Sequence, residues 1–297
     1  MTIIVDSGST KTDWCFITAE GQALRLVTKG INPIVQPEHD VESAILSGAA
    51  AIMSRGKDLD LIHNCISRCA DVLNIFYYGA GCIGKYSKIV ENALSKAFAD
   101  VASINVMSDL YGSARSLFAD EPGIACILGT GSNSCLFDGT AIVNNIPPLG
   151  YVLGDEGSGT SLGKMFINAL FKNGLPSSLR DEYLANESLS LQKILDIVYH
   201  GDKPNAFLAS TSLFIAKHLD CEDIRNIVID NFRFFFRNNV ARYGRQDLPI
   251  GVIGSIAWTY RQFLSDVCAE FGYKLAKISK SPMEGLLRYH LGYKPLV

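Results

Sequence analysis

The chain has 297 residues, of which 48% are hydrophobic and 19% charged, and its formal net charge is −3. This length and composition are typical of a globular protein with one large domain or two ordinary ones, and they exclude a disordered chain. The small net charge argues against broad nucleic-acid binding, and no apolar run approaches the roughly 18 residues that a membrane span needs.

The start of the chain predicts a β-hairpin with small residues at its tip. We expect strands over Thr2–Asp6 and Asp13–Thr18, joined by the residues SGSTKT. Small residues let an anion approach the backbone N–H groups, and Lys11 adds a positive charge. Asp6 is a hard oxygen donor, suited to Mg²⁺. The alternative is an ordinary hairpin with a turn-forming aspartate and a solvated lysine. A P-loop is excluded because its spacing is missing and a strand follows instead of a helix.

Strands and helices then alternate, which predicts an α/β sheet. A loop over Lys29–Pro37 contains Asn32. The expected strands are Ala23–Thr28, Asn74–Tyr78 and Ile104–Met107, and the expected helices are Glu38–Arg55, Leu59–Val72, Gly84–Ala97 and Leu110–Phe118.

Asp109 stands where the strand Ile104–Met107 gives way to a helix. Either Ser108 or Asp109 would serve as an ordinary helix cap. The alternative is a general base at the carboxyl edge of the sheet, where α/β proteins place their ligands. The residues alone leave both interpretations open.

The second half of the chain opens as the first did. A strand over Ile124–Leu128 runs into the small-residue turn GTGSN, and a second strand follows over Ser134–Asp138. Two hairpins of this type, one near the start of each half, indicate a duplicated domain that holds one nucleotide from both sides.

An acidic pair follows, Asp155 and Glu156, flanked by glycines just before a helix expected over Thr160–Lys172. Acidic residues are favourable at a helix N-terminus, which is the simple interpretation. The functional interpretation is that a carboxylate held in this loop binds sugar hydroxyls.

Residues 174–245 are expected to be mostly helical, and their phenylalanines 232, 234, 235 and 236 to form core or a subunit interface. A buried strand is predicted over Pro249–Ile253. The glycine that follows, Gly254, would let a planar ring or a phosphate approach closely. The last strand is expected over Tyr273–Ile278, and a final helix begins at Ser281-Pro282. No flexible linker separates the two halves.

The ordered motifs of the chain resemble a known family. They are IIVDSGSTKTDW, MSDLYGSA, ILGTGSNS, GYVLGDEGSGTSLGK, GVIGSIA and SPMEGLL. Together they resemble the N-acetylglucosamine kinase branch of the actin-like ATPases, a group that also contains the BadF/BcrA-type ATPases. The resemblance implies an α/β fold of two ribonuclease H-like lobes with mixed five-stranded sheets and an interlobe cleft. It places residues 1–112 plus 282–297 in the N-terminal lobe and 113–281 in the C-terminal lobe.

The resemblance also implies a role for each motif. Gly8, Ser9, Thr10 and Lys11 would bind phosphates, as would Gly129, Thr130, Gly131 and Ser132. Gly254 and Ser255 would lie at the adenosine of ATP. Asp6 would orient Mg²⁺, and Asp109 would take the proton of the sugar's 6-hydroxyl. Asn32, Asn133 and Asp155 would bind the sugar.

The implied function is an ATP-dependent kinase that phosphorylates the 6-hydroxyl of an amino sugar, N-acetylglucosamine or a relative. The resemblance also implies a homodimer.

The sequence departs from the usual motifs of the family at two places. Ser7 and Ser9 replace glycines of the usual DGGGTKT motif, and Pro148 and Leu149 replace a frequent Gly-Trp pair, so the pocket for the acyl-amino group is expected to differ.

Two rival functions remain at this point. One is an ATPase activator of acyl-CoA reductases or dehydratases, which holds an iron–sulfur cluster between two subunits. The eight cysteines are scattered and show no such constellation; they are typical of buried thiols in a reducing compartment. The other rival is a nucleotide sensor without turnover. The candidate base and the candidate sugar-binding carboxylate argue against it.

The amino-terminal residues MTIIVDSG lack a basic region, so we expect no signal peptide and a cytoplasmic protein.

Overall fold

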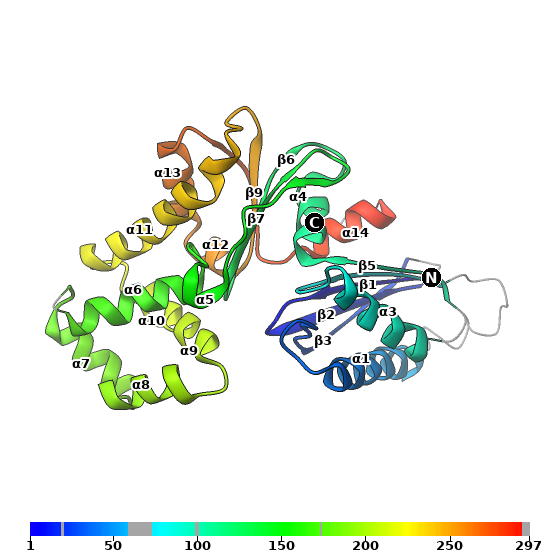
Figure 1. The fold of residues 1–297 in the computed structure, drawn as a ribbon, viewed down its shortest axis with the longest axis horizontal. Helices are drawn as coiled ribbons and strands as arrows, with labels where there is room; N and C mark the ends of the chain where they lie inside the picture. The colour runs from blue at the N-terminus through cyan, green and yellow to red at the C-terminus, as the bar shows by residue number, and fades with distance from the viewer. Residues whose placement is uncertain (19–20, 59–72, 99–100, 173, 293–297) are drawn as a thin grey trace. The chain divides into compact units, whose positions relative to one another are not determined.

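The computed structural model describes residues 1–18, 21–58, 73–98, 101–172 and 174–292. The chain divides into two compact units, each an α/β structure built on one sheet (Figure 1). Unit 1 comprises Met1–Ser116 and Pro282–Val297, and unit 2 comprises Leu117–Ser281. The expected α/β architecture with two mixed five-stranded sheets is confirmed.

The sheet of unit 1 has the strand order β3-β2-β1-β4-β5. Its strands are β1 (Thr2–Ser7), β2 (Lys11–Ile17), β3 (Ala23–Lys29), β4 (Leu73–Gly79) and β5 (Val101–Ser108). The first three form an antiparallel meander, whereas β1, β4 and β5 are parallel. The carboxyl ends of these three strands therefore meet at one edge of the sheet.

Helices cover both faces of this sheet (Figure 1). They are α1 (Glu38–Asp58), α3 (Lys85–Ala97), α4 (Asp109–Phe118) and α14 (Met283–Leu291). Strand β2 shows why two layers form, because its side chains alternate between two cores. Trp14 and Phe16 are buried with α1 and α3, whereas Cys15 and Ile17 are buried with α14.

The sheet of unit 2 has the order β10-β9-β6-β7-β8. Its strands are β6 (Gly123–Leu128), β7 (Ser132–Phe137), β8 (Ile142–Asn144), β9 (Pro249–Ile253) and β10 (Lys274–Ser279). Strands β6 and β7 form the second hairpin, and β6, β9 and β10 are parallel. The glycines 129 and 254 thus both follow the carboxyl ends of neighbouring strands.

Unit 2 is the more helical of the two units. Its helices are α5 (Gly150–Leu153), α6 (Gly159–Phe171), α7 (Ser177–Asn186), α8 (Leu191–His200), α9 (Pro204–Ser210), α10 (Ser212–Lys217), α11 (Glu222–Asn238), η1 (Val240–Tyr243), α12 (Ser255–Thr259) and α13 (Arg261–Glu270). The main core lies between the sheet and helices such as α6 and α11. Phe232, Phe235 and Phe236 belong to that core, whereas Phe234 is 41% exposed.

Most elements were predicted from the sequence to within a few residues. The prediction missed the short strand β8 and the four-residue helix α5, and the helix expected over Leu59–Val72 lies outside the described residues. Of the six cysteines in the described ranges, five are buried and Cys221 is partly buried, and none forms a disulfide. No helix in these ranges is long and apolar enough to cross a membrane.

Candidate active site

The carboxyl edge of the unit 1 sheet brings together residues that are far apart in the sequence. Ser7 at the end of β1 lies opposite Gly79 of β4, and Gly79 lies opposite Ser108 of β5. Neighbouring strands are about 4.8 Å apart, so the ends of β1 and β5 are separated by about 10 Å. Asp6 and Asp109 consequently lie at the same edge, with β4 between their strands.

The first hairpin is tightly closed. Gly8 N–H donates to the carbonyl of Lys11 at 2.9 Å, which leaves Ser9 and Thr10 exposed at the tip. Ser7, which stands where the family often has glycine, is fully buried. Its hydroxyl is 2.8 Å from that of Thr12 and donates to the carbonyl of Ile31 at 3.1 Å. The serine therefore anchors the hairpin to the loop that follows β3.

Asn32 lies against the same tip. Its amide Nδ2 donates to Ser9 Oγ at 3.2 Å, and its Oδ1 accepts from Ile34 N–H at 3.1 Å. Gly30 packs so closely behind the tip that a Cβ there would overlap the backbone of Ser9. Asn32, the expected sugar-binding residue of this unit, is therefore held beside the expected phosphate-binding loop.

Asp109 is the first residue of α4, and the two interpretations of this position can now be separated. Ser108 provides the cap, because its hydroxyl accepts from Tyr111 N–H at 3.2 Å. Asp109 uses Oδ1 to accept from Leu110 N–H at 2.9 Å. The side chain is half-buried, and burial raises its pKa to about 6, against the lowering effect of the backbone N–H groups of Leu110 and of Asp109 itself. A carboxyl group with this pKa is suited to accept a proton near neutral pH.

Asp6 lies in the same electrostatic environment. Burial, together with the charges of Asp109 and Asp13, raises its pKa to about 7, while Lys11 opposes the shift. Asp13 lies directly opposite Asp6 in the β1–β2 ladder. Asp13 was not among the site residues predicted from the sequence. The signal that would have found it is the two-residue alternation of β2, which puts Asp13 on the same face as Lys11.

The second hairpin is fixed by the start of α6. Gly129 N–H donates to the carbonyl of Gly131 at 2.9 Å, which makes the turn. Gly159 N–H then donates to the carbonyl of Gly129 at 2.8 Å, and Thr160 Oγ1 donates to the carbonyl of Thr130 at 2.6 Å. Thr160 is a second residue that the sequence analysis missed, since no local pattern marks a side chain that fixes a distant turn.

Asp155 lies against this hairpin. Its Oδ1 accepts from Ser132 N–H at 3.2 Å, and a Cβ on Gly131 would lie 3.0 Å from its Oδ2. Asp155 is buried in a left-handed conformation with φ 57°. Such a conformation is uncommon outside glycine and is often found at functional sites. Burial raises the pKa of Asp155, while Ser132 N–H and Lys164 oppose the shift.

Gly254 joins the other side of the same hairpin. It follows β9 with φ 132°, and a Cβ at this position would overlap the carbonyl oxygen of Leu128. The backbone therefore requires glycine here. Ser255 opens α12 and is exposed, whereas Asn133, in β7, uses Oδ1 to accept from Ser134 N–H and from Asn145 Nδ2.

The structure thus gathers the predicted residues into two groups. In unit 1 it places Asp6, the hairpin Gly8–Lys11, Asn32 and Asp109 at one sheet edge. In unit 2 it places Gly129–Ser132, Asp155 and Gly254 against one another, with Asn133 on the strand that leaves the hairpin. The acidic neighbour Glu156 has a structural partner, because its Oε1 accepts from Asn238 Nδ2 at 2.9 Å.

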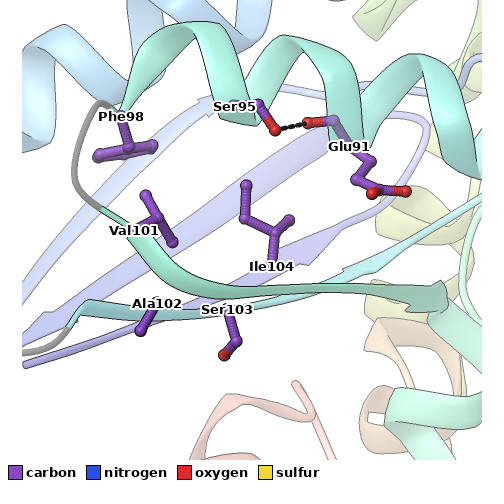
Figure 2. Close-up of a pocket in the computed structure, with 7 residues that line it drawn as sticks. All are labelled: Glu91, Ser95, Phe98, Val101, Ala102, Ser103 and Ile104. Atoms are coloured by element: carbon purple, nitrogen blue, oxygen red, sulfur yellow. Dashed lines mark hydrogen bonds between the residues drawn. The ribbon is translucent and has the colours of Figure 1, made fainter.

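A cavity of about 360 Å³ lies elsewhere, between α3 and the start of β5 (Figure 2). Phe98, Val101 and Ile104 line it together with Glu91 and Ser95. Ser95 Oγ is committed to the carbonyl of Glu91 at 2.9 Å. The cavity is at the amino end of β5, opposite the edge that carries Asp109, and it contains none of the predicted site residues.

The described residues contain no group of three or more His, Cys, Asp or Glu side chains that could hold a metal ion by itself. A magnesium ion bound with a nucleotide needs fewer protein ligands, because it is held by one or two carboxylates together with phosphate oxygens and water.

Comparisons with known proteins identify the family. No protein-family model matches the chain. No curated protein matches it either. Among solved structures, a candidate N-acetylglucosamine kinase from Porphyromonas gingivalis is 43% identical, with 98% of each chain covered and a TM-score of 0.89.

Two more distant structures share the fold. A candidate N-acetylglucosamine kinase from Chromobacterium violaceum is 18% identical, with 97% of this chain and 98% of that chain covered and a TM-score of 0.70. The ethanolamine utilization protein EutJ from Carboxydothermus hydrogenoformans is 12% identical, with 96% of this chain and 86% of that chain covered and a TM-score of 0.51. Given the identity and coverage of the Porphyromonas structure, the chain belongs to the N-acetylglucosamine kinase-like family.

Proposed function

We propose that this protein is an ATP-dependent sugar kinase that transfers the γ-phosphoryl group to the 6-hydroxyl of an amino sugar, N-acetylglucosamine or a close relative. Its 43% identity over 98% of a candidate N-acetylglucosamine kinase supports the activity. The observation that carries the proposal is the position of Asp109, a half-buried carboxyl group with a pKa of about 6 at the edge where β1 also ends.

In this proposal Asp109 acts as the general base. It accepts the proton of the sugar hydroxyl as that oxygen bonds to the γ-phosphorus, and ADP leaves with the electrons of the broken P–O bond. Positioned bases typically contribute about 10²–10⁴-fold to turnover. The remaining acceleration comes from positioning and from the fixed charges around the phosphates.

The two hairpins bind the phosphates of ATP through backbone N–H groups, and Lys11 adds its charge. Gly254 and Ser255 contact the adenosine, at the turn where β9 passes into α12. Asp155 and Asn133 in unit 2, and Asn32 in unit 1, bind sugar hydroxyls. The close contact of Asp155 with the second hairpin supports this assignment, because one carboxylate orders both the turn and the substrate.

The residues present fit a magnesium ion bound with ATP. Asp6 is a half-buried carboxylate at the strand end, and the buried Oδ1 of Asp13, across the hairpin, is one of the side-chain atoms in the described ranges without a hydrogen-bond partner. Asp6 would hold the ion through water or directly. A bound Mg²⁺ neutralises charge on the transferred phosphate.

A panel of sugars tests the proposal directly. The protein is incubated with ATP, MgCl₂ and each of N-acetylglucosamine, N-acetylmuramic acid, glucosamine and glucose, and ADP release is measured. We expect release with at least one amino sugar and a 6-phosphate product identified by ³¹P NMR. Nucleotide binding without ADP release from any sugar would favour a sensor instead. Stoichiometric iron after anaerobic purification would favour the acyl-CoA dehydratase activator.

A further inference from the structure

Two carboxylates of unit 1 face each other across the first hairpin. The β1–β2 register pairs Asp6 with Asp13, and the next in-register pair on the same face is Ile4 with Cys15. Ile4 and Cys15 are buried together against α14. Asp6 and Asp13 therefore project from the same face of the sheet. Directly opposite residues on one face have Cβ atoms about 5 Å apart, which is close enough for both carboxylates to contact one ion.

The Asp13 carboxylate is buried without full compensation. Its side chain is only 9% exposed, and Oδ1 accepts no hydrogen bond from the part of the chain that the structure describes. An unpaired buried acceptor costs about 1–3 kcal/mol. The nearest guanidinium, that of Arg25, is committed to Glu284 at 2.6 Å. The protein therefore leaves an acceptor oxygen beside Asp6 with no partner of its own.

The pairing with Asp6 adds to this cost. Like charges directly opposite each other on two strands are destabilising. Lys11 is on the same face and offsets part of the repulsion, but its side chain is exposed at the hairpin tip. What this pair lacks is a positive charge small enough to fit between two carboxylates, and a divalent cation supplies it.

We propose that Asp13 is a second carboxylate of the divalent-cation site, facing the ion that Asp6 holds. The inference rests on the proposed function, because the ion arrives with the nucleotide of the kinase reaction. Mg²⁺ is typically bound in such sites by one or two carboxylates plus phosphate oxygens, and it retains several waters. The unpartnered Oδ1 of Asp13 would accept a hydrogen bond from water held by that ion.

Binding of Mn²⁺ tests the inference without relying on turnover. The full-length protein is titrated with MnCl₂ in the presence of ADP, and free Mn²⁺ is followed by electron paramagnetic resonance. Loss of groups that support a metal site typically weakens affinity by about 10–100-fold. We therefore expect Asp13→Asn to raise the Kd for Mn²⁺ at least about tenfold. An unchanged Kd would overturn the inference.

Thermal unfolding separates this role from a merely structural one. Without a cation, Asp13→Asn removes one of two facing charges, so its Tm should equal or exceed that of the wild type. The rise in Tm on adding MgCl₂ and ADP should shrink. A lower Tm without cation, combined with an undiminished rise on adding MgCl₂ and ADP, would mean that Asp13 only supports the fold.

Two further variants complete the design. Glu284→Gln removes a carboxylate that also faces Arg25 but lies on α14, and its Kd for Mn²⁺ should stay within about twofold of the wild type. An equal loss of Mn²⁺ affinity in Glu284→Gln would overturn the inference in favour of a long-range charge effect.

Asp6→Asn should weaken Mn²⁺ binding most. If Asp6→Asn has no effect, the magnesium assignment of the proposed function fails. If only Asp13→Asn has none, this inference alone fails.

Discussion

Replacing Asp109 by asparagine should remove catalysis and stabilise the protein at the same time. Asparagine retains the oxygen that accepts from Leu110 N–H, so the start of α4 is preserved. It cannot accept a proton at neutral pH, so turnover should fall by about 10²–10⁴-fold, as expected for loss of a general base. The stability gain follows because the charge of a half-buried carboxylate is removed.

The size of this gain can be estimated from the pKa of Asp109. Burial raises it from 3.8 to about 6. Each pKa unit corresponds to about 1.36 kcal/mol, which sets a ceiling of about 3 kcal/mol. Because the side chain is only half-buried, water screens the charge, and we expect about 1–2 kcal/mol. With about 2–4 °C per kcal/mol for a domain of this size, the Tm should rise by about 2–8 °C.

The pH dependence of this gain tests the cause. A carboxyl group whose pKa is higher in the folded state stabilises the fold below its unfolded pKa, and that contribution is lost as the pH rises through the folded value. The charged form of Asp109 therefore costs stability above about pH 6. The Tm difference between Asp109→Asn and the wild type should be largest at pH 8 and should shrink towards pH 4.5.

Differential scanning calorimetry and a coupled ADP assay measure both effects. Asp138→Asn is the matched control, because backbone N–H groups of Ala141 and Thr140 lower the pKa of this exposed carboxyl. The control should lose stability at pH 8 and retain full turnover. Near-normal turnover of Asp109→Asn would remove the catalytic assignment. A Tm gain that does not depend on pH would refute the electrostatic explanation.

The site gives three more tests, two on other residues and one on the pH profile of the reaction. Asp155→Ala should raise the KM for the sugar about tenfold or more while the KM for ATP changes little, since a buried hydrogen-bonding group is lost; a change confined to ATP would misplace this residue. Gly254→Ala should lower both the Tm and the ATP affinity, measured by calorimetry, because its Cβ would overlap the carbonyl of Leu128; unchanged ATP affinity would argue against an adenosine site there. The kcat/KM should fall about tenfold per pH unit below about pH 6, as Asp109 becomes protonated; a flat profile from pH 5 to 8 would contradict the base assignment.

The elements that position the site were predictable because their signals are local. Strand β9 has the bounds expected for it, Pro249–Ile253, since a short apolar run that begins at a proline and ends at Gly254 defines it. The two missed elements lack such signals. Strand β8 is three residues long and mostly exposed. Helix α5 is a single turn closed by a hydrogen bond from Gly154 N–H to the carbonyl of Gly150, which no periodicity could reveal.

The candidate site was predictable in part for a similar reason. Asp6 and Asp109 were found because each follows an apolar strand, and the edge of a parallel sheet is where such residues meet. Asp13 and Thr160 were missed because their roles depend on strand register and on packing between distant segments. From the sequence, Ser7 was noted only as a replacement for a glycine of the usual motif, whereas the structure shows a buried hydroxyl that contacts Thr12 and the carbonyl of Ile31.

The two hairpins are held in place by different contacts, and these contacts decide where serine can replace glycine. The first is held by hydroxyl groups within its own meander, so Ser7 contributes contacts that glycine could not make. The second is held from outside, by the first N–H groups of α6 and by the carboxylate of Asp155. Gly131 lies so close to that carboxylate that a side chain would displace it. Serine is therefore an anchor in the first hairpin, whereas at Gly131 it would push away the residue that we propose binds the sugar.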